Sequence, residues 1–171
     1  MSRSTRLLWT TAVLSAASFA YLSWLSTAHL SPGEGLKPFD SRVLGYTPDQ
    51  ARLYLSALSP EATSLYLSQV RLWDTLFPAL FAFTLGGVIW TRAAGLRPWV
   101  RLMVRILPAS YVVMDYAENA LVAEMLRAGP TSTDAQIAQA SRYTVIKWGL
   151  AAVSVLLVLW ALFWHRGRTH D

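Results

Sequence analysis

Two acidic residues and an amide lie close together in an otherwise apolar stretch of this chain. Asp115, Glu118 and Asn119 are spaced i, i+3 and i+4, so a helix places all three on one face. An acid in the middle of a membrane costs roughly 2.5–3.5 kcal/mol on insertion scales. Because partners inside a helix bundle normally offset that cost, the spacing predicts a polar site in the interior of a membrane protein.

The composition also indicates a membrane protein. Hydrophobic residues make up 54% of the chain and charged residues 15%, whereas soluble domains carry roughly 25% charged residues. The 8 tryptophans suit the two interfaces of a bilayer. The chain has no cysteine, which excludes thiol redox chemistry, disulfides and cysteine-ligated metals.

The apolar segments predict an all-α protein of one integral membrane domain, residues 1–171, with four membrane-spanning helices at about 7–30, 75–92, 100–127 and 143–165. The third segment is the least apolar, and the distribution of arginine decides that it spans. Clusters of arginine precede the first segment, follow the second and follow the last. The positive-inside rule places all three clusters in the cytoplasm, so both termini are expected there, in a bacterial inner membrane.

Residues 31–73 form the predicted outer segment between the first two spans. Thr47-Pro48 and Ser59-Pro60 each combine a hydroxyl N-cap with proline at the first helical position. Two short amphipathic helices are therefore expected to form an outer helical cap, the second running on into the second span with a bend at Pro78. The first span is expected to be retained rather than cleaved after Ser26-Thr27-Ala28, since its apolar region exceeds the roughly 7–15 residues of a signal peptide.

Antiparallel neighbours allow the depth of each polar residue to be compared, because every helical residue rises about 1.5 Å. Asp74, Glu118, Asn119 and Lys147 fall at one depth, toward the outer face, and Asp115 lies about one turn deeper. The remaining candidates lie one turn from members of this layer; they are Arg71, Tyr111 and Tyr143.

The polar layer supports three functional hypotheses, which the sequence leaves open. Its acids outnumber its bases, and Lys147 is one of only two lysines. We expect binding or transport of a small ligand, lipid or ion in a cavity open to the outside. The alternatives are a structural or accessory membrane subunit, whose layer only locks helix packing, and a lipid-modifying, isomerase-like membrane enzyme. The last rests on a similarity in layout to sterol-isomerase-like proteins, with no matching motif.

Other chemistry is not indicated. The three histidines lie at helix ends, so no metal or haem site is expected, and no other cofactor. The polar layer contains no histidine for a Ser/His/Asp site. The net charge of +5 is explained by topology and anionic lipid headgroups, and no nucleic-acid partner is expected. The expected partners are the lipid bilayer and a small-molecule or lipid ligand; a membrane-protein partner or a homo-oligomer stays open.

Four short motifs carry a resemblance to a known kind of protein. They are Pro38-Phe39-Asp40-Ser41-Arg42, Leu44-Gly45-Tyr46-Thr47, Asp74-Thr75-Leu76-Phe77-Pro78 and Asp115-Tyr116-Ala117-Glu118-Asn119. This pattern, from about residue 37 to residue 150, resembles small, uncharacterised four-helix bacterial integral membrane proteins. The resemblance implies a fold and a location and no activity.

Overall fold

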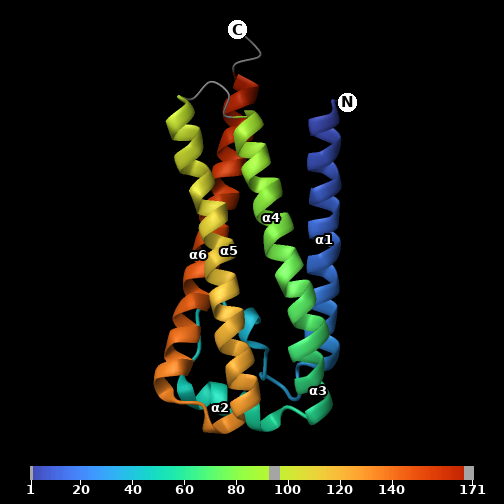
Figure 1. Cartoon of the computed structure of the whole chain (residues 1–171), viewed down its shortest axis with the longest axis vertical. Helices are drawn as coiled ribbons and strands as arrows, with labels where there is room; N and C mark the ends of the chain where they lie inside the picture. The colour runs from blue at the N-terminus through green and yellow to red at the C-terminus, as the bar shows by residue number, and fades with distance from the viewer. Residues whose placement is uncertain (1, 93–96, 168–171) are drawn as a thin grey trace.

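The computed structural model describes residues 2–92 and 97–167 (Figure 1). Within these ranges the chain is helical and contains no strand, which confirms the all-α prediction. The longest helices are α1 (Arg3–His29), α4 (Arg71–Arg92), α5 (Pro98–Ala128) and α6 (Asp134–Gly167). Each contains most or all of one predicted span.

The long helices run side by side and define two ends of the molecule. The start of α1, the end of α4, the start of α5 and the end of α6 lie at one end, here called the basic end after Arg3, Arg92 and Arg97 (Figure 1). The short helices α2 and α3 lie at the opposite end, here called the capped end. Among the long helices, α5 packs against both α6 and α4, whereas α1 packs mainly against α4.

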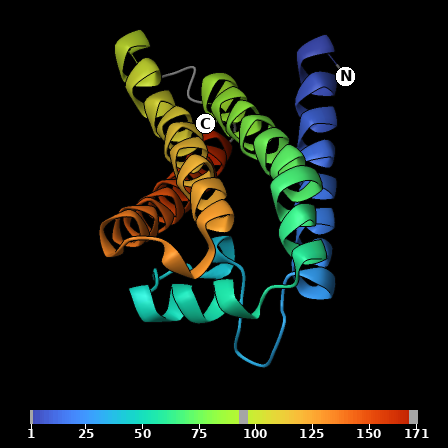
Figure 2. The same cartoon turned by 60° about the horizontal axis from the view of Figure 1, so that its bottom comes forward.

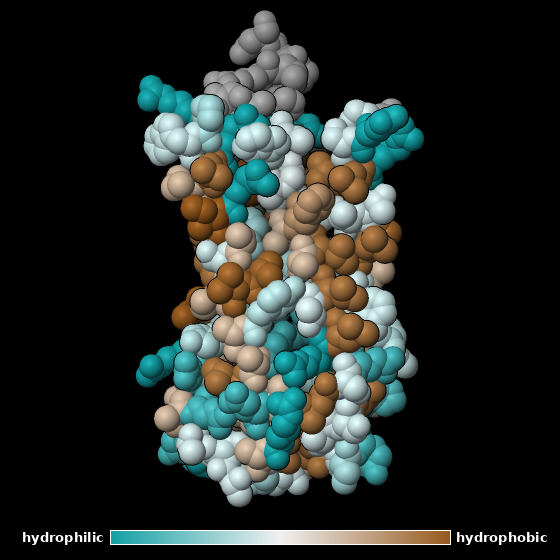
Figure 3. Space-filling model, viewed as in Figure 1, coloured by the Kyte–Doolittle hydropathy of each residue, from teal (hydrophilic) through white to brown (hydrophobic). Residues whose placement is uncertain are grey.

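Three helical runs are long and apolar enough to cross a membrane, judged by length and composition. They are Arg3–His29, Pro60–Arg92 and Asp134–Trp160. Helix α5 is also long, at 31 residues, but its charged residues keep it outside this criterion. Hydrophobic side chains gather along the middle of the long helices, and hydrophilic ones gather at both ends (Figure 3).

The two predicted short helices of the outer segment are present, with the predicted caps. Helix α2 spans Pro48–Ala57, and the Thr47 hydroxyl accepts a hydrogen bond from the backbone N–H of Gln50, whose side chain accepts one from the Thr47 N–H in return. Helix α3 spans Pro60–Leu65 and is capped by Ser59. It continues through a π-helical turn, η2 (Tyr66–Val70), into α4. The prediction that this helix runs on into the next long helix is confirmed.

A buried aromatic cluster holds the loop between α1 and α2 against the capped end. The ring of Phe39, fully buried, lies 4.9 Å from the ring of Tyr46 and 5.0 Å from that of Tyr54. The Tyr54 hydroxyl donates a hydrogen bond to the carbonyl oxygen of Leu30, at the end of α1. Figure 2 shows α2 lying across the turn that joins α5 to α6, the contact that closes this end. These contacts fix the short 3-10 turn η1 (Phe39–Ser41), which carries Asp40.

Gly45 lies where this loop passes close to α6, and it supports a stability prediction. Its φ is +85°, and an added Cβ would lie 2.7 Å from Ser141 Oγ. Gly45→Ala is therefore expected to lower the unfolding free energy by about 2–3 kcal/mol, combining left-handed backbone strain with overpacking.

Gly35 provides the matched control for this substitution. Its φ is +78°, but a Cβ there would meet nothing within 4 Å. Gly35→Ala should show the backbone strain alone, at about 1 kcal/mol. Denaturant unfolding of both variants measures the difference, and equal losses would contradict the close approach of Gly45 to α6.

Candidate functional site

The ammonium group of Lys147 on α6 lies among three carboxylates. It donates hydrogen bonds to Asp40 Oδ1 at 2.6 Å and to Asp115 Oδ1 at 2.9 Å, and it makes an ion pair with Glu118 Oε2 at 2.6 Å. Lys147 is 3% exposed, Asp115 1% and Glu118 0%. These acids come from η1 and α5, so one lysine joins a loop and two helices that are distant in the sequence.

The second oxygen of each α5 acid also has a partner. Thr144, one turn before Lys147, donates its hydroxyl hydrogen to Glu118 Oε1 at 2.5 Å. Asn119 donates its amide hydrogen to Asp115 Oδ2 at 3.0 Å. The structure thus brings Asp115, Glu118, Asn119 and Lys147 together, as the i, i+3, i+4 spacing and the depth comparison indicate.

Asp40 completes the cluster, and the sequence reasoning missed it as a site residue. Its Oδ2 accepts a hydrogen bond from the Tyr66 hydroxyl at 2.9 Å, and its backbone carbonyl accepts one from Trp148 Nε1 at 3.0 Å. Burial raises the pKa of Asp40, but the charge of Lys147 and hydrogen bonds from Lys147 and Tyr66 outweigh it, so the pKa lies below its usual value. Asp40 therefore stays ionised at neutral pH. Its ionised form stabilises the folded chain, and this stabilisation is lost as the pH falls from the ordinary pKa of aspartate to the lowered pKa of Asp40.

Thr144 was also missed, although the sequence held a signal for it. It precedes Lys147 by three residues, so a helix places both side chains on one face. Asp40 had a weaker signal: it lies in one of the short motifs quoted above, but no periodicity in a loop predicts the direction of its side chain. The π-helical turn η2, which orients Tyr66 and Val70, was likewise not predicted; such turns are frequent at functional sites.

Asp74 on α4 lies beside this cluster but is not paired with it. Its side chain is buried, with 9% of the residue exposed, and none of the side chains that the structure describes forms a hydrogen bond or ion pair with its carboxylate. It lines a cavity of about 340 Å³ together with Asp40, Tyr111, Asp115 and Lys147. Buried polar groups normally have hydrogen-bond partners, so an unpaired carboxylate at a cavity wall is an exception that calls for a functional explanation.

The cavity lies in the half of the molecule nearest the capped end. Its remaining wall is mostly apolar and comes from α1, the loop, η2, α4 and α6; the main side chains are Phe19, Leu22, Val43, Val70, Phe77 and Trp148. Ser23, Ser26 and Thr27 of α1 add hydroxyl groups. Because α1 packs mainly on α4, it forms one side of the cavity without reaching the Lys147 cluster on α6. The result is a largely apolar cavity whose wall also carries the charged side chains of Asp40, Asp74, Asp115 and Lys147.

The other three predicted site residues have different positions. Tyr111 is buried at the cavity wall, its ring edge-on to Phe81 at 5.6 Å. The Arg71 side chain forms no ion pair with any acid in the part of the chain that the structure describes. The Tyr143 hydroxyl accepts a hydrogen bond from Gln139 at 2.9 Å instead of meeting the acids.

The cluster has the chemistry of a fixed charge centre. An ammonium group among three carboxylates remains charged, so Lys147 does not act as a nucleophile. The described residues contain no group of three or more histidine, cysteine, aspartate or glutamate side chains that could hold a metal ion. What the site offers to a molecule in the cavity is the carboxylate of Asp74, the hydroxyl of Tyr111 and a chamber of apolar and aromatic side chains.

Comparisons of the chain with family models, with curated proteins and with solved structures find no match.

Proposed function

We propose that this chain is a multi-pass protein of the bacterial inner membrane that binds a small ligand in the Asp74 cavity. In this proposal α1, α4, α5 and α6 cross the bilayer as a four-helix bundle, and α2 and α3 form a cap on the outer side. The observation that carries the binding function is the buried, unpaired carboxylate of Asp74 at the wall of a cavity of about 340 Å³. This volume falls within the range of small-molecule sites.

The position of its charges supports a membrane crossing for α5. Asp115 and Glu118 face the interior and are paired with Lys147. Arg101 and Arg105 lie over the ring of Trp90 near the basic end, at 3.8 Å and 5.0 Å from its centre. The exposed side chains along the middle of the helix are uncharged; they are Ile106, Ala109, Val113, Tyr116 and Ala120.

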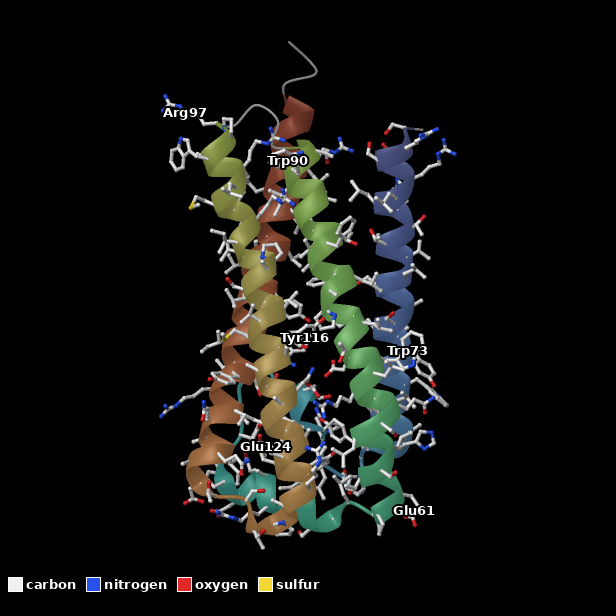
Figure 4. The ribbon with its side chains drawn as sticks, in the orientation of Figure 1. Glu61, Trp73, Trp90, Arg97, Tyr116 and Glu124 are labelled. Carbon is white, nitrogen blue, oxygen red and sulfur yellow. The ribbon has the colours of Figure 1, made fainter. Side chains whose placement is uncertain are left out.

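The two ends of the molecule support the orientation. Figure 4 shows Arg97 and Trp90 at the basic end, Glu61 and Glu124 toward the capped end, and Tyr116 between them. Excess arginine at one end agrees with a cytoplasmic location for that end. The last arginine of the chain, Arg168, lies outside the described residues.

Labelling of single cysteines tests the topology, since the natural chain has none to remove. Cysteine at Gln50 or Asp134 is expected to react with a membrane-impermeant thiol reagent in intact cells. Cysteine at Arg97 should react only after the membrane is opened. Labelling of position 97 in intact cells would contradict the proposed orientation.

Binding of a small neutral probe tests the cavity itself. Benzyl alcohol, an apolar ring with one hydroxyl, is expected to bind the purified protein in lipid nanodiscs, with empty nanodiscs as the blank. Ser26→Trp should fill the cavity and abolish binding, because Ser26 lines it on α1. Thr10→Trp, at an exposed position of the same helix, should leave binding unchanged. Equal binding by both variants would place the probe outside the cavity and overturn the proposed function.

A further inference from the structure

The charges around the cavity are unbalanced. Four carboxyl groups, those of Asp40, Asp74, Asp115 and Glu118, share one ammonium group, that of Lys147. Three of the four contact Lys147 directly, and Asp74 is the one that does not. Arg42, the nearest cation along the loop, lies over the rings of the aromatic cluster instead, 5.4 Å from the centre of Tyr54. A buried, unpaired carboxylate requires either a proton or a positive partner.

The walls of the cavity indicate what kind of positive partner fits. Dedicated Ca²⁺ and Mg²⁺ sites use several oxygen ligands, whereas around this cavity the ammonium of Lys147 already occupies the centre of the carboxylate group. The rest of the wall is apolar and aromatic. The rings of Phe19 and Phe77 lie 5.4 Å apart, and Tyr111 and Trp148 also line the chamber. Aromatic faces attract organic ammonium groups, which inorganic ions with tight hydration shells do not match.

We propose that the ligand of this cavity is an organic cation, an amine or quaternary ammonium attached to an apolar body, and that Asp74 is its charge partner. When no cation is bound, a proton occupies the Asp74 carboxyl group. Binding of the cation releases that proton to solvent, so the charge of the site is the same in both states. This inference rests on the proposed function, because it names the ligand class of the same cavity.

The charged groups around Asp74 already have partners, which identifies Asp74 as the residue that exchanges its proton for the ligand. The titratable side chains that interact with Asp74 from the elements packed against it are Asp40, Tyr66, Tyr111, Asp115, Tyr116, Glu118 and Lys147. The Tyr116 hydroxyl donates its hydrogen to the backbone carbonyl of Thr75. Lys147 holds Asp40, Asp115 and Glu118 in ion pairs, and Tyr66 donates its hydrogen to Asp40. The cavity-facing segment of α1 contributes hydroxyl groups and no titratable side chain. Asp74 is the carboxyl group that is left to exchange a proton for a ligand.

Benzyltrimethylammonium tests the inference, since its positive charge is permanent and its ring matches that of benzyl alcohol. Full-length protein in zwitterionic nanodiscs is titrated with each probe, and released protons are followed with a pH indicator in weakly buffered solution. We expect the cation to bind more tightly as the pH rises and to release protons over the pH range in which the Asp74 carboxyl group of the unliganded protein is protonated. Asp74→Asn should weaken the cation about tenfold or more, equivalent to about 1.4 kcal/mol or more, and weaken benzyl alcohol by much less, because the alcohol carries no charge. Asp49→Asn, a substitution at an acid that is exposed on α2, should alter neither probe.

The outcomes separate this inference from the proposed function. If benzyl alcohol binds in the cavity and the cation binds equally well to the natural protein and to Asp74→Asn, the ligand class is wrong and the cavity remains a binding site. Cation binding that releases no proton at any pH would overturn the exchange. If neither probe binds the natural protein, the proposed function and the inference both fail.

Discussion

Replacement of Lys147 by methionine is expected to destabilise the protein more than any other single substitution in the polar cluster. The change leaves the buried Asp115 and Glu118 and the half-buried Asp40 without their shared ammonium. Breaking a buried ion pair from one side costs about 3–5 kcal/mol, and protonation of the acids offsets part of that cost at low pH. Lys147→Met should therefore show a lower unfolding midpoint in detergent, with a smaller deficit in acid than at neutral pH.

Two further variants test whether this loss of stability comes from the acids that Lys147→Met leaves unpaired. Lys37→Met removes the only other lysine, which is exposed, and should leave the midpoint unchanged. Adding Glu118→Gln to Lys147→Met removes one stranded acid, but Asp40 and Asp115 remain, so we expect only partial recovery. Full recovery in this double variant would show that Asp40 and Asp115 do not depend on Lys147. A Lys147→Met protein as stable as the natural one would overturn the cluster as a structural element.

Asp74→Asn is expected to have the opposite effect: the protein should keep its stability and lose much of its affinity for the organic cation. Its carboxylate has no hydrogen bond or ion pair to lose within the described residues. Keeping this acid protonated in the empty cavity costs free energy that an amide does not, so the substitution should be neutral, or stabilise the fold by about 1 kcal/mol.

Asp115→Asn is the matched comparison, because Asp115 is another acid that lines the same cavity. Its carboxylate accepts hydrogen bonds from Lys147 and Asn119, so the amide should cost about 1.5–3 kcal/mol, the range for hydrogen bonds to charged groups. The unfolding midpoints should therefore rank Asp74→Asn at or above the natural protein and Asp115→Asn below it. Equal losses at both positions would show that Asp74 is part of the structural network.

The helical periodicity of the sequence predicted the features that repeat with each turn of a helix. The spacing of Asp115, Glu118 and Asn119 predicted one polar face because a helix returns to the same side every 3.6 residues. Lys147 could be assigned to the same depth because adjacent antiparallel helices rise equally per residue. The caps at Thr47 and Ser59 followed from local hydrogen bonding, which needs no tertiary contact. These features depend only on residues near one another in the sequence or on the regular rise of a helix.

Tertiary structure decided what lies between the helices. Asp40 reaches Lys147 across 107 residues of sequence, because the aromatic cluster around Phe39 fixes the path of a loop that has no periodicity of its own. Arg71 lies one turn from Asp74, as expected, but within the described residues it forms no ion pair with the cluster, because depth along a helix does not determine which side chains meet. The cavity beside Asp74 exists because α1 packs mainly on α4 and leaves space next to α6. By itself, the sequence determined helices, caps and the depth of most polar residues, since these follow from local geometry. Only packing decided which acids share Lys147 and which one is left unpaired at the cavity wall, because that depends on how the helices rotate and how far apart they lie.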